Sequence, residues 1–141
     1  MIEGAIRPLA LCIIRNGDRI LVMDGYDSKK DEVFYRILGG GVEFGETSED
    51  ALRREFQEEL GTDLENVKFL KVRENIFTFD GKKGHEIVFI FEGDLVNKDL
   101  YSQDNLPILD SKGGHKASWQ EISDFKESKS ILYPDNIIEF I

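Results

Sequence analysis

The amino-acid sequence predicts an α/β fold in which helices pack on both faces of a β-sheet. The run from Ile87 to Phe91 is continuously apolar, as expected of a strand that is covered on both faces. A helix is predicted between Thr47 and Gly61, and the C-terminal segment around Pro134 to Ile141 predicts a second one. Each face of the sheet therefore has one helix available to cover it.

The chain before the first predicted helix is expected to form three strands. Leu9 to Ile14 and Ile20 to Met23 are apolar runs of strand length, and the turn residues 16–18 between them favour a hairpin. The polar stretch 24–32 predicts a loop. Val33 to Ile37 then predicts a strand that leads directly into a glycine-rich loop.

The predicted helix has recognisable residues at both ends. Thr47 is a candidate N-cap with Asp50 three residues later, and Gly61 is a candidate C-cap. Apolar residues at every fourth position form one narrow stripe for packing, namely Leu52, Phe56 and Leu60. Three carboxylates share the neighbouring arc, namely Glu55, Glu58 and Glu59.

After this helix the chain returns to strands. Val67 to Val72 and Ile76 to Phe79 predict two strands, and residues 80–84 predict a turn into the strand Glu86 to Leu95. Residues 96–116 are polar and rich in turn residues, so we expect a mobile surface loop there. No composition shift marks a domain boundary, so residues 1–141 are expected to form a single domain.

The three glutamates are unfavourable in a plain helix. Like charges three or four residues apart repel, and the C-terminal end of the helix dipole disfavours anions. Arg54 lies four residues before Glu58 and can relieve only part of this repulsion, whereas a divalent cation can neutralise the cluster. Acidic helix faces are often simply solvated, so the glutamates alone do not establish a metal site.

The glycine-rich loop before the helix strengthens the case for a metal-bridged phosphate. Gly39, Gly40, Gly41 and Gly45 lie within seven residues. Glycines allow positive φ angles and a close approach of the backbone to a bound anion.

This loop and helix together resemble the Nudix hydrolases. From Gly40 there are five residues to Glu46 and seven more to Arg54, after which residues 55–61 read EFQEELG. Leu38 stands where proline is usual, and Thr62 stands where an aliphatic residue is commoner, but neither position carries a ligand. The fixed spacing of the charged and glycine positions makes this pattern far more specific than a lone glycine motif.

The resemblance implies a Nudix-type α/β/α sandwich with a mixed β-sheet, and a single Nudix hydrolase domain over residues 1–141. It implies a hydrolase that cleaves the pyrophosphate linkage of a nucleoside diphosphate joined to another moiety, as in a nucleotide, nucleotide sugar or dinucleotide. Mg²⁺ is the expected cofactor, with Mn²⁺ as a substitute, because Mg²⁺ binds carboxylates and phosphates while keeping several waters.

Roles in catalysis and metal binding are predicted for the helix. Glu55 and Glu59, one turn apart, are the best-placed pair for a first ion. Glu58 is a candidate for holding a second ion or for positioning the attacking water. The resemblance suggests that a backbone carbonyl at Gly39 or Gly40 completes the coordination. Which carboxylate acts as the base stays open, because clustered acids titrate as a group.

Supporting roles are predicted for three further residues of this segment. Arg54 is expected to orient Glu58 and is grouped with Glu55 and Glu58 as a catalytic residue. Glu46, near the helix start, is expected to brace the loop, and Gly61 is a structural residue that ends the helix.

Substrate contacts are predicted both in the loop and outside it. Gly40 and Gly41 offer backbone groups, and Arg36 just before them is a candidate phosphate contact or an outward strand arginine. His85 and Glu86 begin the apolar strand and would therefore lie at its mouth, where either one can contact substrate or metal.

Several other residues have open or structural interpretations. Arg7 is ambiguous in the same way as Arg36. Glu74 and Glu92 are lesser candidates for an additional acidic ligand. His115 is expected to face solvent, and Trp119 is expected to anchor a strand in the core.

Composition limits the partners and the location. The net charge is −10 with only 18 basic residues, so a long nucleic acid would be repelled. The single cysteine, Cys12, lies among apolar residues and is expected to be buried, and no intrachain disulfide can form. The N-terminal segment lacks the features of a signal peptide, and no apolar run reaches membrane length. We therefore expect a cytoplasmic location and no membrane partner, and leave a homodimer open.

The sequence does not select one substrate. The proline of ADP-ribose-cleaving relatives is absent from residues 76–78, and Phe79 stands near the tyrosine expected in dinucleoside polyphosphate hydrolases. The upstream signature of the coenzyme A-cleaving branch is missing too.

Two alternatives to an enzyme stay open. A nucleotide-sensing module usually loses a glutamate of the motif, and an interaction domain should melt independently of divalent cations.

Overall fold

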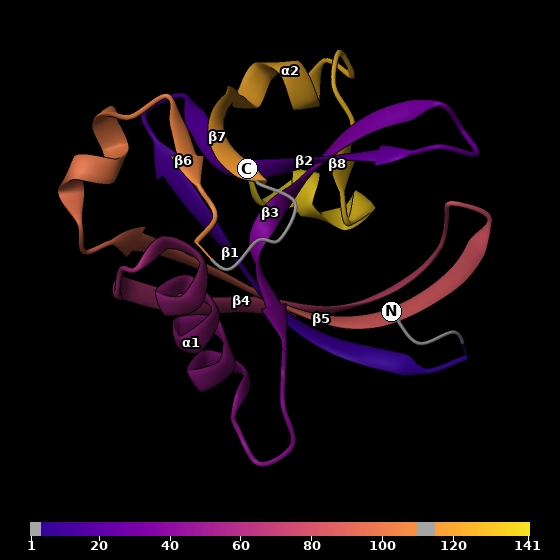
Figure 1. The fold of residues 1–141 in the computed structure, drawn as a ribbon, viewed down its shortest axis with the longest axis horizontal. Helices are drawn as coiled ribbons and strands as arrows, with labels where there is room; N and C mark the ends of the chain where they lie inside the picture. Colours follow the sequence, from indigo (N-terminus) through magenta and orange to yellow (C-terminus); the bar gives the residue numbers. More distant parts are fainter. Residues whose placement is uncertain (1–3, 110–114) are drawn as a thin grey trace.

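The computed structural model describes residues 4–109 and 115–141 as a mixed sheet between helical layers (Figure 1). Its strands are β1 (Ile6–Asn16), β2 (Arg19–Asp27), β3 (Glu32–Gly41), β4 (Leu64–Phe79), β5 (Lys82–Leu95), β6 (Asn105–Pro107), β7 (Lys116–Glu121) and β8 (Leu132–Tyr133). Its helices are α1 (Ser48–Leu60), α2 (Ile122–Lys126) and the 3₁₀ helices η1 (Lys98–Ser102) and η2 (Asp135–Phe140).

The sheet confirms the prediction of mixed strand directions. Within the described residues its order is β4-β5-β1-β3-β2-β7-β6, with β8 beside β3. β1 runs parallel to β5, and β3 runs parallel to β8, whereas the other pairs are antiparallel. The C-terminal half of β3 pairs with β1, so that Gly39 lies opposite Leu11 and Gly40 opposite Ala10. This pairing fixes the start of the glycine-rich loop at the centre of the sheet.

The helix α1 forms where the sequence predicted it. The Thr47 hydroxyl accepts a hydrogen bond from the Asp50 backbone N–H at 3.1 Å, and Gly61 closes the helix with φ 64°. The apolar stripe packs into one core with residues of β1 and β5, and its members are all buried, namely Leu52, Phe56 and Leu60. Each such side chain contributes about 1.5–3 kcal/mol of transfer free energy on burial.

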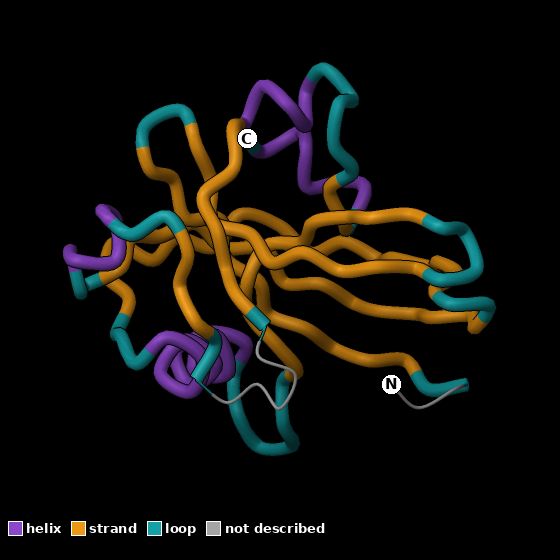
Figure 2. The backbone as a smooth tube through the Cα atoms, turned by 45° about the horizontal axis from the view of Figure 1, so that its top comes forward, coloured by secondary structure: helices purple, strands orange, loops and turns teal. Residues whose placement is uncertain are grey.

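A second core covers the opposite face of the sheet. Side chains of β1 alternate between the faces, with Leu9 and Leu11 in this second core and Ala10 and Cys12 in the core under α1. Figure 2 shows the C-terminal helical segments on the opposite side of the strands from α1. The prediction of a sheet covered on both faces is confirmed. Burial raises the pKa of the Cys12 thiol, as expected of a structural cysteine.

The C-terminal layer differs in detail from the prediction. The segment near Pro134 forms the 3₁₀ helix η2 rather than an α-helix, and the short helix α2 before it was not predicted. Both helices are nevertheless anchored, because Phe125 and Ile137 are fully or nearly fully buried. A helix of one or two turns is too short for a 3.6-residue period to be recognised in the sequence.

The predicted loop over residues 24–32 is wrong at both ends. β2 continues to Asp27 and β3 begins at Glu32, so only residues 28–31 form the turn. The two strands project beyond the core as a hairpin, where polar residues are tolerated on exposed faces. The two strands predicted after α1 are one long strand, β4, whose register with β5 shifts between Glu65 and Lys68 and again between Phe69 and Lys71.

The segment predicted as a surface loop is partly ordered structure. It contains η1 and β6, and Leu100 and Leu106 are buried in the core under α1. Trp119 lies in that core as predicted and stacks on Tyr101 with ring centroids 5.3 Å apart. The Gly113-Gly114 pair lies outside the described residues. In the described part of the chain, no helix has the length and apolar character required to cross a membrane.

Candidate active site

Arg54 lies among carboxylates of the glycine-rich loop and α1. Its Nη2 and Nε atoms donate to the two oxygens of Glu46 at 2.7 and 3.2 Å. Its Nη1 lies 3.0 Å from Glu55 Oε1 and 3.3 Å from Glu58 Oε2. Nη2 also donates to the Gly41 carbonyl at 2.9 Å. One guanidinium therefore joins the loop to both turns of the acidic helix face.

Negative charge exceeds positive charge in this Arg54 cluster. The hydrogen bond from Arg54 lowers the pKa of Glu46, and the same bond raises the pKa of the guanidinium. Glu43 adds a fourth carboxylate, 3.8 Å from Nη2. Four carboxylates thus surround one positive charge, which leaves the cluster with three excess negative charges.

Glu46 also holds the loop itself. Its Oε1 accepts a hydrogen bond from the Glu43 backbone N–H at 2.9 Å, while both of its oxygens bind Arg54. The loop around Gly45 is consequently tied to α1 through one side chain. This is the location in which the sequence analysis expected Glu46.

Gly40 allows a carboxylate to lie against the backbone of the loop. A Cβ atom on Gly40 would come within 2.5 Å of both carboxylate oxygens of Glu55, a distance that real Cβ atoms do not reach. Gly39 has φ 146°, and a Cβ there would overlap the carbonyl oxygen of Ala10 in the neighbouring strand. Glycine is therefore required at position 39 for steric reasons, whereas a side chain at position 40 would displace the Glu55 carboxylate.

One cavity of about 280 Å³ brings the predicted residues together. It is lined by Glu55 and Glu59 from α1, by the three glycines 39–41, and by Arg7 and Arg36. Glu59 is only 7% exposed, and its backbone carbonyl accepts a hydrogen bond from the Leu109 N–H at 2.8 Å. The acidic side of the helix and the glycine-rich loop therefore face the same space.

The chemistry of this cavity fits a hard divalent cation. Mg²⁺ and related ions prefer carboxylate and carbonyl oxygens, which are the atoms found here. Among the described residues, no three acidic, histidine or cysteine side chains are close enough together to form a complete metal site. Glu55 and Glu58 both accept hydrogen bonds from Nη1 of Arg54. The donor atoms are suitable, and Arg54 holds the carboxylates of two of the candidate ligands, Glu55 and Glu58.

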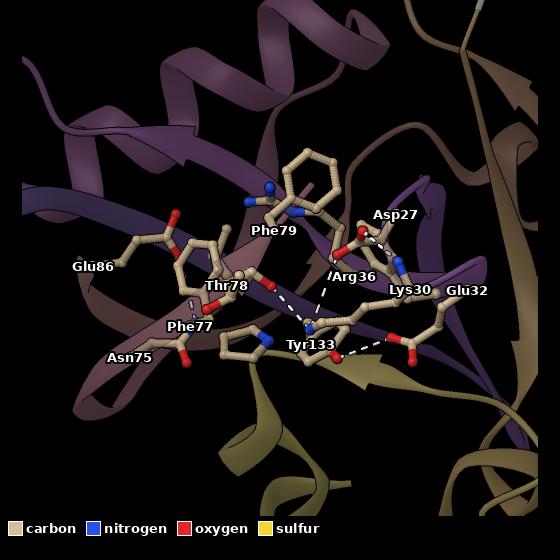
Figure 3. A pocket seen from close by; sticks show the side chains of 13 residues that line it. Asp27, Lys30, Glu32, Arg36, Asn75, Phe77, Thr78, Phe79, Glu86 and Tyr133 are labelled. Carbon is tan, nitrogen blue, oxygen red and sulfur yellow. Dashed lines mark hydrogen bonds and ion pairs between the residues drawn. The ribbon is translucent and has the colours of Figure 1, made fainter. Parts of the chain in front are cut away.

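Arg36 joins this cavity to a second pocket (Figure 3). Burial lowers the pKa of Arg36, the charge of Arg7 lowers it further, and Glu86 and Glu59 oppose this change. Glu86 is 7% exposed and accepts a long hydrogen bond of 3.5 Å from Asn75 Nδ2. Of the predicted substrate-contacting residues, Arg36 therefore lies at the boundary between the two spaces, and Glu86 lines the second pocket.

The second pocket has aromatic walls from three parts of the chain. Phe34 contacts Phe79 and Tyr133 edge-to-face, with ring centroids 5.8 and 5.3 Å apart. Phe77 lines the same pocket. Lys30 Nζ donates to the Thr78 carbonyl at 2.9 Å across its rim (Figure 3). Such walls suit a planar ring with polar groups at its edge.

Asp27 fixes the outer end of this second pocket. It is 2% exposed, and its Oδ1 accepts hydrogen bonds from the Lys29 and Lys30 backbone N–H groups at 3.0 and 3.1 Å. Its Oδ2 accepts one from the Asp80 N–H at 3.1 Å. Burial raises the pKa of Asp27, but these donors outweigh it and lower the pKa overall. One carboxylate thus ties the β2–β3 hairpin to the β4–β5 hairpin.

This role of Asp27 was not predicted from the sequence. An aspartate that binds the backbone two or three residues later is a common turn signal, and it was available in the polar stretch 24–32. The contact with Asp80 crosses 53 residues and had no such signal.

Other candidates lie apart from the cavity of Glu55 and Glu59. His85 lines a different cavity with Ile6 and Ile76, and the two cavities share no lining residue. Glu92 pairs with Arg15 at 2.9 Å. His115 is exposed at the start of β7, as expected. The interpretation of His85 as a residue of this site therefore has no support in the geometry.

Known proteins resemble this chain in sequence. Residues 5–137 match the NUDIX domain family. The NAD-capped RNA hydrolase NudC of Klebsiella pneumoniae (strain 342) is 29% identical over 114 residues, which cover 77% of this chain and 44% of that protein. The Uncharacterized Nudix hydrolase YvcI of Bacillus subtilis (strain 168) is 25% identical over 130 residues, which cover 92% of this chain and 75% of that protein. The chain spans less than half the length of the NudC relatives.

Solved structures share the fold. A NUDIX hydrolase from Nitrosomonas europaea has a TM-score of 0.68 at 18% identity, covering 96% of this chain and 85% of its own. A MutT NUDIX hydrolase from Burkholderia pseudomallei has a TM-score of 0.56 at 22% identity, covering 86% and 88%. These likenesses confirm the predicted Nudix-type α/β/α sandwich. Nudix enzymes generally use divalent metal ions. Because the family match extends over nearly the whole chain, the protein belongs to the Nudix hydrolase family.

Proposed function

We propose that this protein is a divalent-metal-dependent hydrolase that cleaves the pyrophosphate linkage of a nucleoside diphosphate joined to another moiety. The observation that supports this most is the Arg54 cluster, in which four carboxylates surround one guanidinium. Such a cluster alone would repel a polyanionic substrate. A divalent cation between the carboxylates and the phosphates removes that repulsion.

The proposed ligands come from α1 and the loop. Mg²⁺, or Mn²⁺ as a substitute, would be held by Glu55, Glu58 and Glu59 with the backbone carbonyl of Gly39. The bound ion would neutralise phosphate oxygens and lower the pKa of a bound water. Glu58 is the most exposed of the three glutamates, so it is the proposed group for accepting a proton from the attacking water.

Arg54 and the glycines have positioning roles in this proposal. Arg54 holds Glu55 and Glu58 on one side of the helix and fixes the Gly41 carbonyl. Gly40 leaves room for the Glu55 carboxylate beside the backbone. These contacts limit the motion of the acidic groups before substrate binds, and so reduce the entropy lost on reaching the reactive arrangement.

The substrate is proposed to be a small molecule with a planar ring. The pocket lined by Phe34, Phe77 and Phe79 begins at Arg36, and its aromatic walls would lie beside a ring attached to a diphosphate in the neighbouring cavity. The NudC relatives are named as hydrolases of NAD-capped RNA, so dinucleotides belong among the test substrates. The net charge of −10 disfavours a long RNA.

A substrate panel tests this proposal. Purified protein is incubated with Mg²⁺ and nucleoside diphosphates, nucleotide sugars and dinucleotides, and the products are separated by chromatography. We expect a nucleoside monophosphate and a phosphorylated remainder from at least one substrate, and no products after addition of EDTA. Binding of these compounds without any cleavage would instead support a nucleotide-sensing module. The retention of all three glutamates favours the enzyme.

A further inference from the structure

We propose that Arg7 and Arg36 form a two-arginine site for the second phosphate of the substrate, in the cavity that Glu55 and Glu59 of α1 also line. Arg7 comes from β1 and Arg36 from β3, and both line the cavity of Glu55 and Glu59. This inference rests on the proposed function in one respect, namely that the bound anion is the substrate's diphosphate.

The position of Arg7 depends on the glycine-rich loop. Val42 donates its backbone N–H to the Pro8 carbonyl at 3.0 Å, which places the loop directly beside the start of β1. Arg7 Nη2 lies 3.3 Å, and Nε 3.6 Å, from the point where a Cβ on Gly41 would lie. The absent side chain therefore leaves the Arg7 guanidinium room to pack against the loop and face the cavity.

Neither arginine forms a close ion pair with another described residue. In the described part of the chain, no carboxylate oxygen lies within 4.0 Å of the guanidinium of Arg7 or Arg36. Burial and, to a smaller extent, the charge of Arg7 lower the pKa of Arg36, while the charges of Glu86 and Glu59 oppose them. Two mutually repelling cations beside one cavity are favourable when an anion lies between them. Arginine also matches phosphate geometry through paired N–H donors.

The cavity is consequently lined by two kinds of group. Carboxylates and glycine carbonyls suit a cation, and the guanidinium groups suit an anion directly. A diphosphate could contact both, with one phosphate near the carboxylates and the other beside the arginines. Figure 3 shows the Arg36 side chain extending past Phe79, with its guanidinium directed away from Lys30 and Glu32. A group attached to the arginine-bound phosphate could therefore enter the aromatic pocket.

The test measures binding of inorganic pyrophosphate by calorimetry, with Mg²⁺ and separately in EDTA. The variants are Arg7→Gln, Arg36→Gln and Arg36→Lys, and the matched control is Arg15→Gln. Arg15 also lies on β1, so its variant has the same net charge as Arg7→Gln, but Arg15 pairs with Glu92 outside the cavity. Circular dichroism and melting temperature establish that each variant is folded, and Arg36→Lys replaces Arg36→Gln if the latter does not fold.

Loss of either arginine should weaken pyrophosphate binding about 10-fold to 100-fold, as expected for lost charge-assisted hydrogen bonds. Arg15→Gln should bind like the unchanged protein, and Arg36→Lys should recover only part of the affinity, because lysine lacks the paired donors. Equal affinity in Arg7→Gln and the unchanged protein would overturn the inference, as would absence of pyrophosphate binding in both buffers. Arginine-dependent binding by a protein that cleaves no nucleotide would instead sustain this inference and reject the proposed function.

Discussion

The Arg54 cluster and Asp27 are two charged sites with opposite balances. Around Arg54, four carboxylates share one guanidinium, so negative charge is in excess. Asp27 is a single carboxylate that accepts three backbone N–H groups, so its charge is fully solvated by the protein. An acidic residue therefore indicates a ligand site when negative charge exceeds the available donors, and a structural role when the protein supplies enough donors for it.

The largest expected effect is loss of turnover in Glu59→Gln. This change keeps the shape of a buried side chain and removes one proposed metal-binding charge. We expect turnover to fall by about 100-fold or more, as is typical when a group essential to the chemistry is removed, with the melting temperature nearly unchanged. Steady-state kinetics of the best substrate from the panel give the measurement. Glu49→Gln is the matched control on the same helix, because Glu49 pairs with Arg53 on the exposed side. Near-normal turnover in Glu59→Gln would contradict the assignment of Glu59 as a metal ligand.

The next effect is expected from Gly40→Ala. The added methyl group would occupy the space of the Glu55 carboxylate, which must then move away from the cavity. Turnover should fall by about 10-fold to 100-fold, since misplacement by about 1 Å has effects of that order. Gly45→Ala is the comparison within the same loop. An added Cβ there meets no atom within 4 Å, but the alanine backbone would have to adopt φ 91°. Gly45→Ala should therefore lower the melting temperature more than it affects turnover, and equal kinetic losses would contradict the steric argument.

A smaller kinetic effect is expected from Glu46→Gln. The change removes the strongest partner of Arg54 and loosens its hold on Glu55 and Glu58. We expect turnover to fall by roughly 10-fold, near the lower end of effects seen for residues that orient metal ligands. The KM should change little, because Glu46 does not line the cavity. A rise in KM with unchanged turnover would mean that Glu46 acts on substrate binding instead.

Asp27→Asn should leave metal binding unchanged and lower stability. The amide has only one acceptor oxygen, so its NH2 group would face either the Asp80 N–H or the Lys29 and Lys30 N–H groups without accepting from them. The melting temperature should therefore fall by several degrees near neutral pH. Asp24→Asn is the control, as an exposed aspartate on the same strand. An unchanged melting temperature in Asp27→Asn would show that the tie between the two hairpins is not stabilising.

The same variant gives a defined pH dependence. The pKa of Asp27 is lowered in the folded protein, so its stabilising effect is complete above the unfolded pKa of about 3.9. That contribution is lost as the pH falls through the folded pKa. The difference in melting temperature between the unchanged protein and Asp27→Asn should therefore be constant from about pH 5 to 7 and shrink below about pH 4.

The two charged sites also differ in how far the sequence could predict them. The Gly41 carbonyl is the Arg54 contact most distant in the chain, at 13 residues, so the spacing along one loop and helix was sufficient. Asp27 binds Asp80 across 53 residues, and that contact depends on how two hairpins lie together. Helix α1, its caps and a sheet covered on both faces could be predicted from the local sequence pattern. The aromatic pocket and the presence of Arg7 and Arg36 beside one cavity depend on strand order, which one sequence does not reveal.

The central claim is that the glutamates of α1 bind a divalent cation. Calorimetric titration of the purified protein with Mn²⁺ and with Mg²⁺, alone and with a nucleotide present, tests it most directly. We expect a saturable binding signal that is greatly weakened in Glu55→Gln and Glu59→Gln and unchanged in Glu49→Gln. Absence of binding by the unchanged protein under all of these conditions, or equal binding by all of the variants, would contradict the claim.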